Sequence, residues 1–366
     1  MHTVKRLLLN TVAGANVVTV LMMLATGFSD RVDPEAFPQL ACLGMAFPLF
    51  PLANMAFLLF WVFFSWRRLP IALIGFVLAY TPINIYIPLK PMEAPPPGCL
   101  KVVSYNVHGY SGMKWGQDIF DSVYTYLVGQ QADIVCLQED NDTWRNGSRR
   151  FAQAFSCNDT VRISTRSGSM TNHVGIHSRF PVIRKERIPM PSATQMNGAA
   201  AFYMALPADT AMVIVAHLEN IHLNSQDRLT YKKMLKRELA GDTVTAEGRN
   251  ILDKLTGAFH VRAIQVKTIC SYVSEHQNGH PVILCGDLND TPISFTRHTL
   301  ARQLTDCFVE SGQGLGLSYN QKGFNFRIDH VFCSSHFCPY SCQIDREIEV
   351  SDHYPVVTWL KMQDKY

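Results

Sequence analysis

The stretch 280–292 places two short polar side chains, Asp287 and Asn289, directly after an apolar run. Four apolar residues followed by Gly286 predict a buried strand that stops at a tight turn. Residues i and i+2 of an extended chain face the same way, so this carboxylate and this amide should stand together at the rim of a sheet. A plain Asn-Asp-Thr-Pro turn would explain the same residues without chemistry. The residues at the other strand ends decide between a functional site and a plain turn.

Further apolar runs in the second half of the chain also end or begin at residues that can bind a cation or move a proton. Taken singly, each has an ordinary explanation as an exposed charge or a satisfied core histidine. Turn preferences alone do not select acids, amides and histidines at six separate strand boundaries. The additional candidates are Asn106, Glu139, His217, Asp329, Asp352 and His353.

The candidate residues are mainly oxygen donors and histidines. Oxygen ligands such as Asn106, Glu139 and Asp352 suit a hard divalent cation, above all Mg²⁺, with Mn²⁺ as an alternative. None of the ten cysteines forms a Cys-x-x-Cys pair, which argues against a structural zinc site. An acid-paired histidine, a second histidine and an Asp/Asn pair could orient a water and neutralise charge that develops on phosphorus.

These residues lie in the second of two regions, because a chain of 366 residues exceeds one average domain. Residues 1–90 contain three uncharged runs, and about 20 helical residues suffice to cross a bilayer. They predict a transmembrane region with spans at about 7–28, 38–64 and 69–89. A signal peptide is the alternative for the first span, and the third is the most polar. The proline-rich stretch 91–98 predicts a stiff linker, which leaves 99–366 as the second domain.

The second domain has an α/β pattern. Strands are predicted at 100–107, 132–139, 174–182, 200–206 and 211–218, and helical stretches at 115–130 and within 224–276. Residues 96–366 carry 27 basic and 26 acidic side chains. This balance shows no basic excess of the kind that nucleic-acid-binding domains carry, so nucleic acid is a partner that charge does not support.

The motifs Ser104-Tyr105-Asn106, Leu137-Gln138-Glu139, His217-Leu218, Gly286-Asp287-Leu288-Asn289, Arg327-Ile328-Asp329 and Ser351-Asp352-His353 resemble those of the endonuclease/exonuclease/phosphatase superfamily. The resemblance covers about 100–362, and the motifs occur in the family's order. Together with the N-terminal region, it is similar to the membrane-anchored bacterial branch. It implies a four-layer α/β sandwich of two packed, mainly antiparallel sheets flanked by helices, with about three transmembrane helices before it.

The resemblance also implies a role for each candidate residue. Asn106 and Glu139 would ligate the metal, with Asp352 near or on it. Asp287 and Asn289 would hold the attacking water and the phosphate, and His217 would donate to the phosphate. Asp329 would orient His353, and either His353 or Asp287 would take the proton. One departure is Ala216, where a polar residue is usual before the histidine.

The implied activity is Mg²⁺-dependent hydrolysis of a phosphodiester or phosphomonoester at a membrane. The alternative is a catalytically silent, membrane-tethered binding module on the same fold. DNA is one candidate substrate class; a phospholipid or inositol phosphate head group is the other. The sequence leaves the oligomeric state open.

The charges beside the spans predict the orientation of the protein in the cytoplasmic membrane. Lys5, Arg6, Arg67 and Arg68 favour the cytoplasmic side, which places the catalytic domain outside, in the periplasm of a bacterium with two membranes. The nine cysteines after residue 95 weakly favour a reducing compartment instead.

Overall fold

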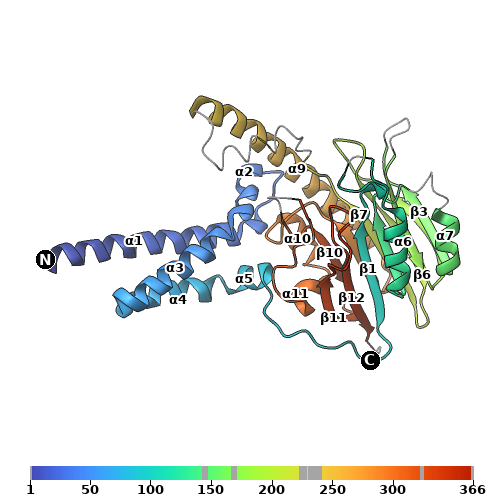
Figure 1. The fold of residues 1–366 in the computed structure, drawn as a ribbon, viewed down its shortest axis with the longest axis horizontal. Helices are drawn as coiled ribbons and strands as arrows, with labels where there is room; N and C mark the ends of the chain where they lie inside the picture. The colour runs from blue at the N-terminus through green and yellow to red at the C-terminus, as the bar shows by residue number, and fades with distance from the viewer. Residues whose placement is uncertain are drawn as a thin grey trace.

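A computed structural model describes residues 2–114, 116–141, 147–165, 171–221, 229, 241–321 and 325–363. Helices near the N-terminus project from one side of an α/β domain (Figure 1). The two parts are joined by residues 87–99, which contain no helix or strand.

Two six-stranded sheets form the centre of the α/β domain. Their strand orders are β11-β12-β1-β2-β4-β3 and β5-β6-β7-β8-β10-β9. In each sheet one central pair, β1–β2 or β7–β8, is parallel, and all other neighbours are antiparallel. The strands are β1 (Leu100–Asn106), β2 (Ile134–Gln138), β3 (Cys157–Arg162), β4 (His173–Ser178), β5 (Val182–Ile188), β6 (Gly198–Ala205), β7 (Thr210–His217), β8 (Val282–Asp287), β9 (Thr305–Asp306), β10 (Asp329–Cys333), β11 (Phe337–Ile344) and β12 (Val356–Met362).

The apolar runs of the central strands are explained by burial on both faces. Val102 of β1 and Ile283 of β8 belong to the core between the two sheets. Their neighbours Val103 and Leu284 point the other way, into two outer cores beneath the helices. A strand covered on both sides reads as a continuous apolar run rather than an alternating one.

Helices cover the outer face of each sheet, which gives the four layers (Figure 1). α6 (Phe120–Gly129) and α7 (Gly147–Ala154) pack on the first sheet, and α9 (Gly241–His276) and α10 (Phe295–Leu300) on the second. The short α11 (Cys307–Ser311) packs beside β11. The two mainly antiparallel sheets with flanking helices confirm the predicted domain architecture.

Three details differ from the sequence-based expectation. The predicted helix at 115–130 forms only over α6, and Trp115 lies outside the described residues. The predicted strand at 174–182 is the end of β4 and the start of β5, because the chain turns at Arg179–Pro181 and changes sheets. Of the helical stretch 224–276, the structure describes Leu229 and α9.

The N-terminal region consists of apolar helices that differ in length and straightness. Residues Thr3–Arg31 form one helix long and apolar enough to cross a membrane. The stretches Pro38–Phe64 and Trp66–Tyr86 meet the same test only as pairs, bent by 46° and 61°. The elements are α1 (His2–Gly27), η1 (Ser29–Arg31), α2 (Pro38–Ala41), η2 (Cys42–Ala46), α3 (Leu49–Phe64), η3 (Trp66–Arg68), α4 (Leu69–Leu78) and α5 (Tyr80–Tyr86).

Candidate active site

The predicted site residues converge because the central strands of both sheets end at one edge. Asn106 is the last residue of β1, and Glu139 follows β2. In the second sheet His217 and Asp287 end the parallel strands β7 and β8 and lie opposite each other in the register. Asp329 starts β10 and is paired with Asp287. Short segments from distant parts of the sequence thus deliver polar side chains to one place.

A cavity of about 400 Å³ opens at this edge. The two predicted residues that do not line it, Asn106 and Asp329, hydrogen-bond to residues that do. The fold therefore brings all eight candidates together. The six that line the cavity are Glu139, His217, Asp287, Asn289, Asp352 and His353.

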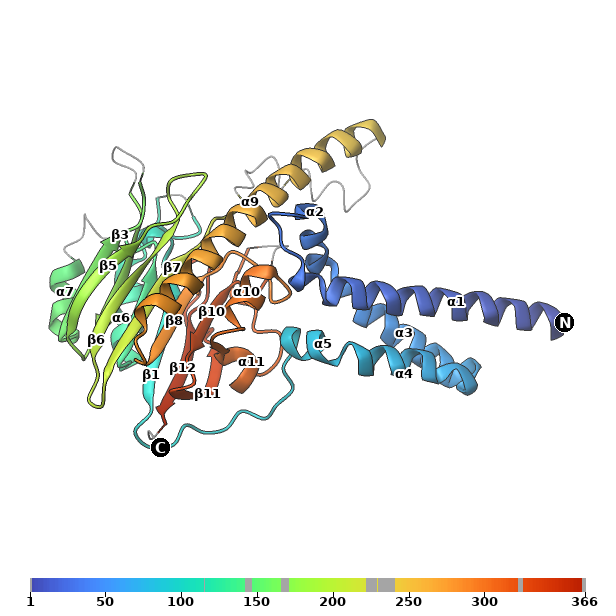
Figure 2. The ribbon, with the colours of Figure 1, turned by 180° about the vertical axis from the view of Figure 1, so that it is seen from behind.

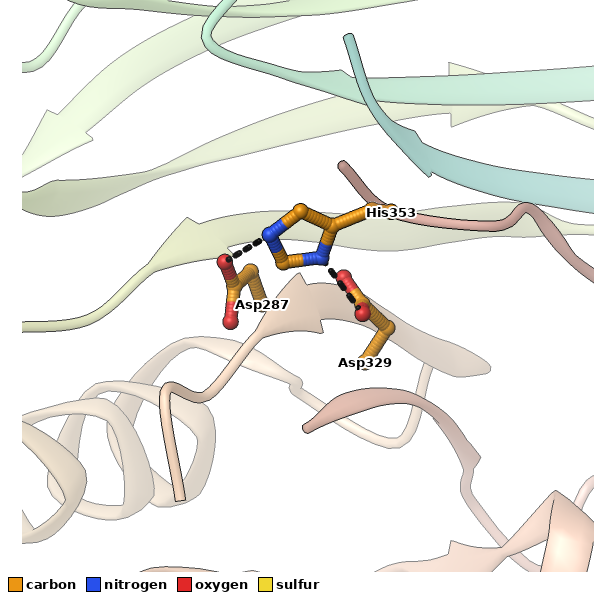
Figure 3. Close-up of side chains that lie close together, drawn as sticks. All are labelled: Asp287, Asp329 and His353. Carbon is orange, nitrogen blue, oxygen red and sulfur yellow. Dashed lines mark hydrogen bonds and ion pairs between the residues drawn. The ribbon is translucent and has the colours of Figure 1, made fainter. Parts of the chain in front are cut away.

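His353 lies between two aspartates (Figure 3). Its Nδ1 atom is 2.8 Å from Oδ2 of Asp329, and its Nε2 atom is 3.6 Å from Oδ2 of Asp287. The backbone N–H of Asp329 donates to Oγ of Ser318, which helps to fix the start of β10. Asp329 thus orients the imidazole so that its other nitrogen faces Asp287.

The surroundings change the acidity of this group. Burial and the nearby Asp329 carboxylate raise the pKa of Asp287 to about 6. Burial opposes the charged form of His353, but the charges of Asp329 and Asp287 outweigh it and raise the pKa of His353 well above its ordinary value. At neutral pH the arrangement therefore favours a protonated imidazole between two carboxylates.

A second set of contacts links Asp287 to the first sheet. Nδ2 of Asn106 donates to Asp287 Oδ2 at 3.0 Å and to Glu139 Oε1 at 3.3 Å. The backbone N–H of Asn289 donates to Asp287 Oδ1 at 2.8 Å. Glu139 and Asn289 both have positive φ, 56° and 52°. Non-glycine residues in this conformation carry strain, which commonly marks a functional site.

His217 is positioned by a residue that the sequence did not single out. Asn172, just before β4, donates from Nδ2 to His217 Nδ1 at 3.0 Å and to the carbonyl of Met196 at 3.0 Å. The amide donor leaves Nδ1 as an acceptor, so a neutral His217 carries its proton on Nε2. That atom lies 3.6 Å from Glu139 and 3.8 Å from Asp287. Asn172 thus supplies a hydrogen bond at the histidine that follows the unusual Ala216.

The donor atoms fit a hard divalent cation. Among the described residues, one group of three acids and histidines has ligand atoms within 4.8 Å of one another: Asp287, Asp329 and His353. Oδ1 of Asp329 is buried without a hydrogen-bond partner. The oxygen donors predicted for the metal, Glu139 and Asp352, line the same cavity. Carboxylate oxygens in this number are the ligands that Mg²⁺ prefers.

Other residues at the site also carried no recognisable motif. The His108 Nδ1 atom lies 3.6 Å from Asp352 Oδ1, on a turn where His108 itself has a φ of 49°. Tyr319 packs edge-on against the ring of His353, with centroids 5.0 Å apart. Met45, from the N-terminal region, lines the cavity as well. In the sequence, only His108 stands near the end of a predicted strand. The positions of Tyr319 and Met45 at the cavity depend on how loops pack together.

Comparisons with known proteins agree with this architecture. Residues 271–353 match the endonuclease/exonuclease/phosphatase family, and residues 6–86 match a domain of unknown function (DUF8431). A search of curated protein sequences finds no match.

Solved structures share the fold at low sequence identity. An endonuclease/exonuclease/phosphatase from Beutenbergia cavernae is 16% identical, with 72% of each chain covered and a TM-score of 0.53. An endonuclease/exonuclease/phosphatase family protein from Bacteroides thetaiotaomicron is 15% identical, with 75% of this chain and 100% of that chain covered and a TM-score of 0.51. The α/β domain therefore has the same fold as these two proteins, and part of it, residues 271–353, matches the endonuclease/exonuclease/phosphatase family.

Proposed function

We propose that this domain is a Mg²⁺-dependent phosphoester hydrolase in which water attacks a phosphodiester or phosphomonoester. The observation that carries the proposal is the row Asp329–His353–Asp287, in which a hydrogen bond joins the first pair and an ion pair the second, beside a cavity lined by Glu139 and His217. Perturbed acids and histidines that converge in one cavity are the usual mark of acid–base chemistry. A binding module would not need such an arrangement.

The raised pKa values favour one assignment of the proton transfers. His353 is protonated at neutral pH, because two aspartates face its nitrogens. Asp287 loses its proton above a pKa of about 6, so it is the better acceptor for a proton from the attacking water. Water adds to phosphorus, the bond to the leaving oxygen breaks, and the His217 Nε2–H can donate to a phosphoryl oxygen.

Glu139 and Asn106 would hold the cation, with Asp352 near or on it, and Asn289 would help to place the water and the phosphate. A bound divalent cation supplies positive charge that stabilises the phosphoryl oxygens as bonds change. Cation ligation by the Asn106 oxygen would require the amide to rotate, because its nitrogen donates to Asp287 and Glu139 and its oxygen accepts from the backbone N–H of His108.

The test is hydrolysis by the purified full-length chain in detergent, with Mg²⁺, with Mn²⁺ and with EDTA. Bis(p-nitrophenyl) phosphate and p-nitrophenyl phosphate report on diesters and monoesters. Duplex DNA, abasic DNA, sphingomyelin and inositol phosphates then separate the substrate classes. We expect metal-dependent release of p-nitrophenolate. A folded protein that hydrolyses none of these substrates would favour the silent binding module.

We further propose that the N-terminal region spans the membrane three times, through α1, the bent pair 38–64 and the bent pair 66–86. Large apolar side chains are exposed along all three segments, for example Leu21, Phe63 and Val77, as expected for contact with lipid. Between the helices, Asn16 donates to Asn54, and Asn54 donates to the carbonyl of Ala72, at 2.9 Å each. Such polar contacts between helices are typical of membrane bundles.

The helix ends support an orientation with the catalytic domain outside the cytoplasm. Arg68 donates to Asn10, which places the η3 turn beside the N-terminal half of α1, far from the α/β domain (Figure 2). The basic residues of both segments thus lie at one end of the bundle and the domain at the other. Fusions after Pro97 test this: active alkaline phosphatase and dark green fluorescent protein are expected, and the reverse pattern would place the domain inside.

A further inference from the structure

The segment between α1 and α3, residues 28–48, docks on the catalytic domain and reaches its cavity. Gly44 of this segment lies directly against Ile293, six residues after Asp287 in the loop that carries Asn289. A Cβ atom on Gly44 would lie 2.1 Å from the Ile293 carbonyl oxygen. Ile293 is 1% exposed and packs in one apolar cluster with Met23 and Phe47 of the N-terminal region. The loop of the active site is therefore anchored in the end of the helical bundle.

Polar contacts flank this apolar anchor. Lys267 of α9 binds Asp33 and Glu35 at 2.6 Å each, and His298 lies 3.3 Å from the buried Asp30. The two ribbon views, Figure 1 and Figure 2, show α2 beside α9.

A buried arginine makes a further connection at the end of α5. Arg327, two residues before Asp329, donates to the carbonyls of Ile85, Tyr86 and Leu315. Positive charge at the carboxyl end of a helix is favourable, because the last carbonyls lack partners within the helix. The bundle thus contacts two of the segments that supply catalytic residues.

The docked segment also changes the chemistry of the cavity. Met45 lines it together with Ile221 and Phe259, while Glu139, Asp287 and His353 line it with polar atoms. One cavity therefore combines groups suited to a phosphoester with an apolar wall. Met45 is only four residues before Leu49, the first residue of α3, a helix whose large exposed side chains are apolar.

We propose that the N-terminal region forms one wall of the active site, and that Met45 contacts an apolar group of a phosphoester substrate held at the membrane surface. The inference rests on the proposed hydrolase function and names the substrate class: an amphiphilic phosphoester whose phosphate enters the cavity while its chain stays in the lipid. Water forms a bond to phosphorus and gives a proton to Asp287, one P–O bond breaks, and the leaving oxygen departs with the bonding electron pair.

The experiment compares p-nitrophenyl octyl phosphate with p-nitrophenyl methyl phosphate, using the full-length chain in lipid nanodiscs with Mg²⁺. Loss of p-nitrophenolate leaves the alkyl phosphate in both cases, so the two esters differ only in the apolar group. Wild type should prefer the octyl ester in kcat/KM. Met45→Gln should lower the octyl-to-methyl ratio by roughly tenfold, the scale of a lost apolar contact in a pocket. Met45→Leu should retain the ratio, and so should Met92→Gln, a matched change in the exposed linker.

The outcomes separate the two proposals. If wild type hydrolyses neither ester, this inference is overturned, and the hydrolase function is then decided by the assays with bis(p-nitrophenyl) phosphate and p-nitrophenyl phosphate. If both esters are hydrolysed equally, or Met45→Gln keeps the wild-type ratio, the hydrolase stands and the inference is overturned. p-Nitrophenyl hexadecyl phosphate in the same nanodiscs tests the source of the substrate. Hydrolysis of the hexadecyl ester supports a substrate that is held in the bilayer. Cleavage of the octyl ester alone would contradict the proposal that the substrate comes from the membrane.

Discussion

The side-chain amide of Asn172 donates to Nδ1 of His217 across 3.0 Å, and this contact decides which nitrogen of the histidine faces the cavity. Because Nδ1 accepts a hydrogen bond, Nε2 of the neutral ring carries the proton on the side of Glu139 and Asp287. The two residues are 45 positions apart in the chain. His217 can therefore act as a hydrogen-bond donor toward a phosphoryl oxygen without being charged.

Replacing Asn172 tests this positioning role. Asn172→Leu frees the ring to turn and to exchange tautomers, and we expect kcat to fall about 10- to 100-fold, the usual effect of losing the partner that orients a functional histidine. Asn158→Ala is the matched control, because Asn158 also holds one histidine, His177, and one backbone carbonyl, but outside the cavity. Equal activity of the two variants would contradict the assignment.

The pair Asp329–His353 should be indispensable for turnover. Asp329→Asn removes the charge that stabilises the protonated imidazole and orients it. We expect a loss of about 10²- to 10⁴-fold in kcat, the range for a positioned acid–base group. Asp345→Asn is the control, since Asp345 also accepts a hydrogen bond, from Tyr126, but away from the cavity. Retained activity in Asp329→Asn protein of unchanged melting temperature would refute the role.

The raised pKa of Asp287 predicts how activity depends on pH. The carboxylate must be unprotonated to accept a proton from water, so kcat/KM should fall as pH decreases through about 6. The charge of Asp329 raises the pKa of Asp287 more than the charge of His353 lowers it, so in Asp329→Asn protein the acid limb of the residual activity should shift to lower pH. A pH profile whose acid limb is the same in both proteins would contradict this coupling.

His177 predicts a pH effect on stability rather than on activity. Burial lowers the pKa of this histidine to about 3, while an unfolded histidine has a pKa of about 6.5. Between about pH 6.5 and pH 3 this histidine binds a proton in the unfolded chain but stays neutral in the folded protein. The stabilisation is therefore complete above about pH 6.5 and declines as pH falls toward 3.

The matched variant is His177→Gln, which keeps a polar partner for Asn158 and cannot be charged. The melting temperature of wild type should fall relative to this variant between about pH 6.5 and pH 5. Parallel curves over that interval would contradict the assignment of a buried neutral His177.

Local sequence patterns could predict the strand ends, because buried strands read as apolar runs and the candidate site residues stand where those runs stop. Asn106, Asp287 and His353 were predicted in this way. Asn106 and Asp287 each end a strand of a parallel pair, and the two side chains meet through a hydrogen bond. Asn172 could not be found, because its role depends on a loop that meets β7 only in the folded chain.

The sequence also did not predict that the N-terminal region contributes to the cavity. A charge-free run followed by a proline-rich linker predicts a tether that is separate from the domain. Met45 and Gly44 nevertheless lie against the α/β domain, because the loops at the end of the helical bundle pack on it. Apolar patterning reports burial, but it does not distinguish burial in lipid from burial against another domain.

The central claim is that this cavity hydrolyses phosphoesters with the help of a divalent cation held by Glu139. The direct measurement is the Mg²⁺ dependence of bis(p-nitrophenyl) phosphate hydrolysis by wild type and Glu139→Gln, with Glu275→Gln, an exposed acid on α9, as the control. Wild type and Glu275→Gln should show the same saturable activation by Mg²⁺, and Glu139→Gln should lose at least about 10²-fold in rate. Activity in Glu139→Gln equal to that of wild type would contradict the account.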